Sequence, residues 1–309
     1  MKKAFRPKDI RKSFRPKSIQ HVYQRSLDRG VLFYTVADRL VYYTLAAVKS
    51  KKHNVRVYAA ALMFTHIHQS LAPYSLDDLL WYLHDLDTSF VRLYNARYHR
   101  TGRLFDQRTG RSQKLSLKEK RTNLIYVYNN HVEKGLCRHA VDERWSLLAY
   151  AMSDHPFSPE MKKPVSRHLS RALKLVDRRV EAGKALEYCD LDGIFSRLNR
   201  TELQQFIDYV ISRYRLVDFE GAAAHFGSLE NLIAAADATT GGEYDIREDY
   251  SKDRDTGYAI LARNAAANGY LRDIFVLSDE ARLEAAEMSA RLAGVSLDQI
   301  RRFFRLPRE

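Results

Sequence analysis

The sequence predicts an α+β unit followed by a helical unit, and three observations support this fold class. Strand-like and helix-like patterns alternate over residues 18–150, a segment with three prolines follows at 153–164, and the remaining chain is mostly helical in its periodicity. A chain of 309 residues is also long for a single domain. We therefore expect a basic arm at 1–17, an α+β domain at 18–153 and a helical extension at 165–309.

The first unit is predicted to run in the order strand, helix, strand, helix. Alternating apolar residues indicate a strand, and apolar residues spaced three or four apart indicate a helix. The expected elements are a strand at 19–25, a helix at 36–52, a buried strand that begins at 55 and carries His66 and His68, and a helix from 76 to 98. A basic, glycine-containing stretch follows at 97–121, and then a helix at 123–133 that ends near Gly135.

His66 and His68 follow the apolar run 55–65. Side chains at i and i+2 of a strand point to the same side, so the two imidazoles are expected to project together and could share one metal ion. Such a pair is, by itself, also typical of hydrogen-bonded or surface histidines. The pattern therefore indicates a candidate metal site, which would need further ligands nearby.

Tyr126 and Asn130 are candidates for those further groups. They lie four residues apart on the predicted helix at 123–133, so one helix face presents a phenol and a carboxamide together. Beside a metal ion, the amide oxygen of Asn130 could serve as a ligand and the phenol of Tyr126 could attack a phosphodiester. The alternative is an ordinary core tyrosine whose hydroxyl is hydrogen-bonded.

Five short motifs occur in order between residues 18 and 150. They are His21-Val22-Tyr23-Gln24-Arg25, Met63-Phe64-Thr65-His66-Ile67-His68, Gly102-Arg103-Leu104-Phe105-Asp106-Gln107, Tyr126-Val127-Tyr128-Asn129-Asn130-His131-Val132-Glu133-Lys134-Gly135-Leu136, and Arg144-Trp145-Ser146 with Tyr150. In order and spacing this set resembles the Y1 tyrosine transposases of the insertion-sequence 200/605 type, and especially their REP-associated relatives.

The resemblance implies a fold, an activity and a set of site residues. The fold would be that of the HUH endonucleases, an antiparallel sheet with helices in a ferredoxin-like or RNA-recognition-motif-like topology. Tyr126 would be the catalytic nucleophile that cuts single-stranded DNA and leaves a 5′-phosphotyrosine. His66, His68 and Asn130 would hold Mg²⁺ or Mn²⁺. The activity would be that of an endonuclease and strand transferase acting in DNA transposition on hairpin or repeat DNA.

The chain departs from the family pattern at two places. Phe64-Thr65 stands before the histidines instead of Pro-Asn, and His131-Val132-Glu133-Lys134 stands where the family has Pro-Val-Arg-Ala. Substrate contacts near the end of the tyrosine helix are therefore expected to differ. A DNA-binding regulator without catalysis stays an alternative, whereas Ser70 stands where a histidine-triad hydrolase would need its third histidine.

The composition points to a polyanionic partner. The chain has 51 Lys and Arg against 38 Asp and Glu, a net charge of +13, and 19 Tyr and 14 Phe that offer stacking surfaces. Nucleic acid is thus the expected partner class. The candidates for phosphate contact in the stretch between the histidines and the tyrosine helix are Arg97, Arg100, Arg103, Arg108, Arg111 and Lys114.

The helical extension ends in a predicted helix-turn-helix at 279–305. Ala290, Gly294 and Ile300 have its spacing, and Ser296 with Gln299 predicts a capping box for the second helix. Arg301, Arg302 and Arg305 would then contact duplex DNA, unless the pair is an ordinary helical hairpin with a basic face. Further helices are expected at 165–182, 201–217 and 229–238, with a long polar loop at 239–257.

Several classes of protein are not favoured. Cys137 and Cys189 lack metal-binding or disulfide spacing, and no apolar segment has the length of a signal peptide or a membrane span. We expect a cytoplasmic protein that acts as a monomer or homodimer without a membrane partner.

Overall fold

The structure is a computed structural model that describes residues 14–16, 18–106, 109–238, 255–268 and 274–306. The predicted basic arm therefore lies almost wholly outside the described residues. Arg108 and most of the predicted polar loop at 239–257 lie outside them as well. The last residues of that loop, Asp255–Gly257, form the first turn of a helix instead.

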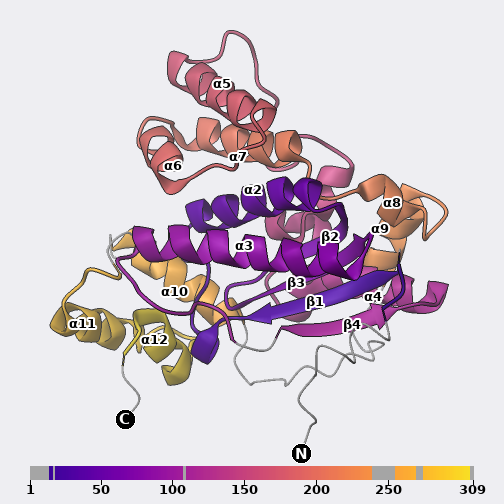
Figure 1. Cartoon of the computed structure of the whole chain (residues 1–309). Coiled ribbons are helices and arrows are strands. Elements are labelled where there is room, and N and C mark those ends of the chain that lie inside the picture. Colours follow the sequence, from indigo (N-terminus) through magenta and orange to yellow (C-terminus); the bar gives the residue numbers. More distant parts are fainter. Residues whose placement is uncertain (1–13, 17, 107–108, 239–254, 269–273, 307–309) are drawn as a thin grey trace, which may run out of the picture.

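A four-stranded antiparallel sheet forms the centre of the first unit, in the order β2-β3-β1-β4 (Figure 1). Its strands are β1 (Ile19–Arg25), β2 (Val55–Leu62), β3 (His66–Pro73) and β4 (Gly110–Lys114). Helices pack on this sheet and a helical region follows it. The predicted α+β fold class is confirmed.

Two helices cover one face of the sheet and a third helix covers the other. On the first face, the Gln69 side chain donates to the hydroxyl of Tyr42 of α2 (Val36–Lys52) and accepts from that of Tyr82 of α3 (Leu76–Arg97). On the second face, the next residue of β3, Ser70, donates to Asn123 of α4 (Leu117–Glu133), 2.7 Å away. The alternation of side chains along β3 thus separates the two layers.

The expectation of one strand from residue 55 through the histidines was wrong. The chain reverses at Met63–Thr65, so His66 and His68 begin the next strand, β3, which pairs antiparallel with β2. This turn has none of the usual Gly, Pro, Asn or Asp signals. Met63 and Phe64 are apolar because each is buried in a different cluster, Met63 beneath α4 and Phe64 against the C-terminal helices.

The basic stretch at 97–121 contains one strand that its pattern did not indicate, and the beginning of the helix that was predicted from residue 123. β4 is a short edge strand of polar and charged residues, which suits an edge because charge discourages pairing with another chain. Helix α4 begins at Leu117 rather than 123, after a capping box in which Ser116 and Glu119 bond each other's backbone N–H groups. The S-x-x-E pattern of that cap is visible in the sequence.

All the remaining elements of the described residues are helices, and the sequence did not predict three of the α-helices, α6, α8 and α10. The bounds are η1 (Leu27–Arg29), η2 (Ala140–Asp142), η3 (Arg144–Ser146), η4 (Leu148–Ala151), α5 (Arg167–Glu181), α6 (Tyr188–Phe195), α7 (Arg200–Tyr214), α8 (Phe219–Ala223), α9 (Leu229–Ala238), α10 (Asp255–Ala267), α11 (Asp279–Ser289) and α12 (Leu297–Phe304). No helix among the described residues is both long enough and apolar enough to cross a membrane.

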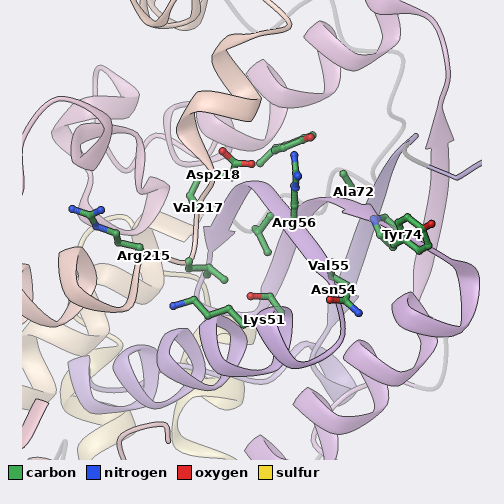
Figure 2. A pocket seen from close by; sticks show the side chains of 14 residues that line it. Lys51, Asn54, Val55, Arg56, Ala72, Tyr74, Arg215, Val217 and Asp218 are labelled. Atoms are coloured by element: carbon green, nitrogen blue, oxygen red, sulfur yellow. The ribbon is translucent and has the colours of Figure 1, made fainter. Parts of the chain in front are cut away.

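The outer edge of the sheet is partly covered by the segment after α7. Val217 bridges to Val57 of β2 in parallel, and the N–H of Asp218 donates to the carbonyl of Val57, 2.8 Å away. Beside this contact lies a cavity of about 860 Å³, where Lys51, Arg56 and Arg215 are among the lining residues (Figure 2).

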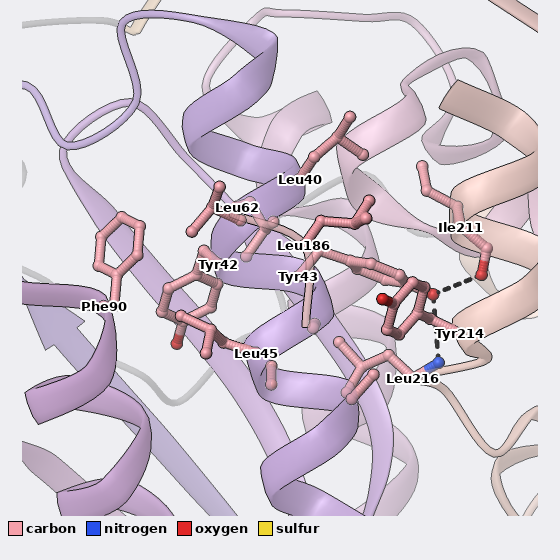
Figure 3. Close-up of a cluster of buried hydrophobic side chains, with 14 of the residues drawn as sticks. Leu40, Tyr42, Tyr43, Leu45, Leu62, Phe90, Leu186, Ile211, Tyr214 and Leu216 are labelled. Atoms are coloured by element: carbon pink, nitrogen blue, oxygen red, sulfur yellow. Dashed lines mark hydrogen bonds between the residues drawn. The ribbon is translucent and has the colours of Figure 1, made fainter. Parts of the chain in front are cut away.

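The helices after the proline segment share a hydrophobic core with the first unit. Residues of α2 such as Leu40 and Tyr43 pack in one cluster with Leu186, Ile211 and Leu216 (Figure 3). The sequence pattern changes at the predicted boundary, 153–164, but residues before and after it belong to one hydrophobic core.

The C-terminal helices form a further cluster against the first unit. Phe303 of α12 packs on Tyr34, whose hydroxyl donates to the carbonyl of Phe303, 3.0 Å away. Helices α11 and α12 and the capping box of Ser296 with Gln299 are present as predicted, and Gly294 between them has a φ of +82°. Contact with duplex DNA stays a prediction.

Candidate active site

His66 and His68 lie on the face of the sheet that α4 covers. They occupy the first and third positions of β3, and their rings are 5.1 Å apart between centroids. Tyr23 of β1 pairs with His68 and stacks on its ring at 4.7 Å. The predicted projection of the two imidazoles to one side is confirmed by this arrangement.

Helix α4 brings Tyr126 and Asn130 onto the same histidines. The Oδ1 atom of Asn130 lies 3.4 Å from Nε2 of His66, and the ring of Tyr126 lies 5.3 Å from that of His68. Tyr126 lies 58 residues after His68 in the sequence. The four predicted site residues therefore form one cluster.

His21 belongs to the cluster, although sequence reasoning gave it no role. Its Nε2 lies 2.9 Å from Nδ1 of His68, and its ring lies 5.6 Å from that of Tyr126. One ring nitrogen must donate and the other accept, so His21 orients the ring of His68, and the tautomers of the two rings are coupled. The sequence did hold a sign of this role. His21 and Tyr23 are two residues apart on the predicted strand, so their side chains lie on the same face of β1.

The donor atoms fit a divalent cation. Two ligands about 2.1 Å from one ion can lie up to about 4 Å apart, and the 3.4 Å between Nε2 of His66 and Oδ1 of Asn130 falls within that limit. No three His, Cys, Asp or Glu side chains in the described residues are placed to hold a metal, so an ion here would need the Asn130 amide. Because Mg²⁺ prefers oxygen ligands, a set with two imidazoles favours Mn²⁺.

The cluster is closed to solvent. Tyr126 is 2% exposed, and His68 and Asn130 are fully buried. The Nδ2 atom of Asn130 has no hydrogen-bond partner among the described residues, which leaves a buried amide donor beside the histidines. Burial lowers the pKa of the neighbouring His131 to about 4, so this imidazole is uncharged at neutral pH.

Among the described residues, the predicted DNA contacts at 97–114 lie at separate places. Arg97 is ion-paired with Asp192 of α6 at 2.6 Å. Arg111 donates to Gln20, 2.9 Å away, and pairs with Val22 in the sheet, so it lies on the face opposite to His68. Burial lowers the pKa of Arg111. These two guanidinium groups already have partners within the protein.

The other predicted cations are placed differently. Arg103 is exposed, and Lys114 is partly exposed at the end of β4. Arg100 lines a cavity of about 400 Å³ together with Arg301, Arg302 and Arg305. Two groups predicted separately, in the basic stretch and in the C-terminal helix, therefore meet.

No family model matches the chain, and no curated protein matches it significantly. Among solved structures, it is similar to a REP-associated tyrosine transposase bound to a REP hairpin, with 14% identity and a TM-score of 0.40. The similarity covers 54% of this chain and 98% of that chain. A similarity this weak carries no argument about the site, so the assignment of the site rests on the contacts described above.

Proposed function

We propose that the chain is a metal-dependent single-stranded DNA endonuclease and strand transferase in which Tyr126 is the nucleophile. The observation that carries this proposal is the convergence of Tyr126 and Asn130 of α4 on His66 and His68 of β3. A phenol beside two imidazoles and an amide oxygen combines a nucleophile with the ligands of a divalent cation. The net charge of +13 suits a DNA substrate.

The chemistry assigns each side chain a task. The phenol oxygen of Tyr126 attacks a phosphodiester: a bond from that oxygen to phosphorus forms and the bond from phosphorus to the 3′-oxygen breaks. The phenol loses its proton, and the leaving 3′-oxygen gains one. His66, His68 and Asn130 would hold Mn²⁺ or Mg²⁺, which supplies charge stabilisation at the phosphate. The phosphotyrosine conserves the bond energy, so a second 3′-hydroxyl can be joined.

The test is formation of a covalent protein–DNA adduct. Wild-type protein, Mn²⁺ and end-labelled hairpin DNA with single-stranded flanks, ideally from repeats flanking the gene, are incubated and separated under denaturing conditions. We expect a metal-dependent adduct with wild type and none with Tyr126→Phe.

Tyr128→Phe is the matched control. Tyr128 is two residues away on the same helix and is buried, but its hydroxyl donates to the backbone carbonyl of Tyr58. This variant should still form the adduct. If Tyr126→Phe formed as much adduct as wild type, the assignment of Tyr126 as the nucleophile would be wrong.

The burial of the site favours one second candidate, a DNA-binding regulator that does not cut. A phosphodiester cannot reach Tyr126 while this residue is 2% exposed, so catalysis requires a movement that uncovers it. A regulator would need no such movement. Hairpin binding by wild type without any adduct, across all flanking repeats and with either metal, would support the regulator.

A further inference from the structure

Four arginines from two distant parts of the chain line one cavity. Arg100 follows the end of α3, whereas Arg301 and Arg302 lie on α12 and Arg305 caps its C-terminus. The cavity has a volume of about 400 Å³, and its other walls include Ser26, Tyr34, Tyr94 and Leu104. Two hundred residues separate Arg100 from Arg301, so only the fold brings these guanidinium groups together.

The protein holds each of the four side chains in place. The Arg100 guanidinium donates to the side chain of Asn95 at 3.1 Å, and that of Arg305 stacks over Phe275 at 4.8 Å. Arg301 and Arg302 share one carboxylate, Asp298, at 3.4 and 3.1 Å. These contacts reduce the freedom that the side chains lose when a ligand binds.

The charges at this cavity do not balance among the described residues. Asp28 in the lining and Asp298 behind it are two carboxylates against four guanidinium groups. Burial and then the like charge of Arg305 lower the pKa of Arg100. Holding like charges together in a partly buried cavity is costly unless an anion enters.

The cavity adjoins the candidate active site. Ser26 is one of the lining residues. Its backbone N–H donates to the carbonyl of Thr65 at 2.9 Å, and Thr65 directly precedes His66. Arg25, the last residue of β1, pairs with His66. In Figure 1, α12 lies at the end of β1. The wall of the cavity also includes Tyr94 of α3, which covers the other face of the sheet. A DNA strand leaving the site would therefore have to pass around this end of the sheet to reach the arginine cavity.

We infer that the cavity lined by Arg100, Arg301, Arg302 and Arg305 binds a backbone phosphate of the DNA strand that occupies the neighbouring site. Planar guanidinium groups match phosphate oxygens in two-pronged hydrogen bonds. Helix α12 then serves as a clamp on the strand next to the cut. This inference rests on the proposed function for the identity of the strand, whereas the anion site stands on the arginines themselves.

The test compares two variants that each remove two positive charges. Arg301→Gln/Arg305→Gln changes the cavity, and Arg171→Gln/Arg178→Gln changes exposed arginines of α5, far from α12 (Figure 1). Both are made in a Tyr126→Phe background, so that no covalent bond forms, and binding of fluorescent hairpin DNA with single-stranded flanks is measured by anisotropy against salt concentration.

We expect the cavity variant to weaken binding at least about tenfold more than the α5 variant. Its salt dependence should fall by about 0.7 for each lost phosphate contact on a single strand. Equal weakening by both variants, or wild-type affinity of the cavity variant, would overturn the inference. These outcomes are independent of adduct formation by the protein that retains Tyr126, so failure of the nuclease assignment stays distinguishable.

Neutral methylphosphonates placed one at a time along the flanks test the same contact from the DNA side. One position should weaken binding by the Tyr126→Phe protein and have no further effect on the cavity variant, as a double-mutant cycle requires for a direct contact. Inorganic pyrophosphate at matched ionic strength tests a free ligand. If the cavity variant loses pyrophosphate binding but keeps full DNA affinity, the cavity serves a small phosphate compound and the DNA assignment is wrong.

Discussion

At the scale of single residues, the alternation of side chains explains why most of the candidate site could be predicted. His66 and His68 share a face by strand geometry, and Tyr126 and Asn130 share a face by helix geometry. That both faces meet was implied only by a family resemblance. His21 was overlooked because one histidine in a strand has many ordinary explanations, and its contact with His68 becomes visible only in three dimensions.

A buried carboxyl on the other face of the sheet makes stability depend on pH. Gln24 donates to both oxygens of Asp87, at 2.8 and 2.7 Å, yet burial raises the pKa of Asp87 to about 7. The unfolded chain ionises this group near pH 4 while the folded protein keeps it protonated. The stability contributed by Asp87 is therefore present below about pH 4 and is lost as the pH rises to about 7.

Asp87→Asn should remove this dependence. We expect the unfolding free energy of the variant, relative to wild type, to rise by about 2 to 3 kcal/mol between pH 5 and pH 8. Urea unfolding at the two pH values measures it. A difference between the proteins that is the same at both pH values would show that the carboxyl titrates normally in the folded state.

At the scale of elements, the structure departs from the predictions where tertiary contacts outweigh local pattern. The turn at Met63–Thr65 carries apolar residues because two different clusters bury them, so no turn signal remained. β4 is polar because it is an edge strand. The arginine cavity could not be predicted, since nothing in the sequence relates Arg100 to α12.

The hydroxyl of Tyr43 links α2 to α7 and to the segment that follows α7. Tyr43 donates to the carbonyl of Ile211 at 2.8 Å and accepts from the N–H of Leu216 at 3.1 Å (Figure 3). Tyr43→Phe removes the acceptor of the Leu216 N–H, whereas the carbonyl of Ile211 keeps the N–H of Arg215 at 3.2 Å. We expect a loss of about 1 to 3 kcal/mol in unfolding free energy. Tyr74→Phe, at a side chain 69% exposed, is the control and should change stability by less than about 0.5 kcal/mol. Equal effects would contradict the role of this hydroxyl.

At the scale of the whole molecule, the first unit and the following helices depend on each other. Asp208 of α7 binds Arg144 at 2.9 Å and Tyr150 at 2.7 Å, so the last of the five sequence motifs is tied to a later helix. Tyr188 of α6 donates to the buried Asp38 at 2.9 Å. The proline segment was predicted to divide the chain because composition changes there, whereas the buried surfaces continue across it.

A chain that ends at residue 164 should therefore not fold by itself. Its loss of α5, α6 and α7 would expose the apolar side of α2 and leave Asp38 without one of its donors. We expect no cooperative thermal unfolding by circular dichroism, in contrast to the full chain. A cooperative transition at the midpoint of the full chain would show that residues up to 164 are an independent domain.

The central claim is that Tyr126 carries out the chemistry, and the most direct measurement is to locate the DNA on the protein. The adduct formed by wild-type protein with Mn²⁺ and hairpin DNA is digested with nuclease and protease, and the modified peptide is sequenced by mass spectrometry. The account predicts a nucleotide joined through its 5′-phosphate to Tyr126. A nucleotide on any other residue, or unmodified Tyr126 after DNA has been cut, would contradict it.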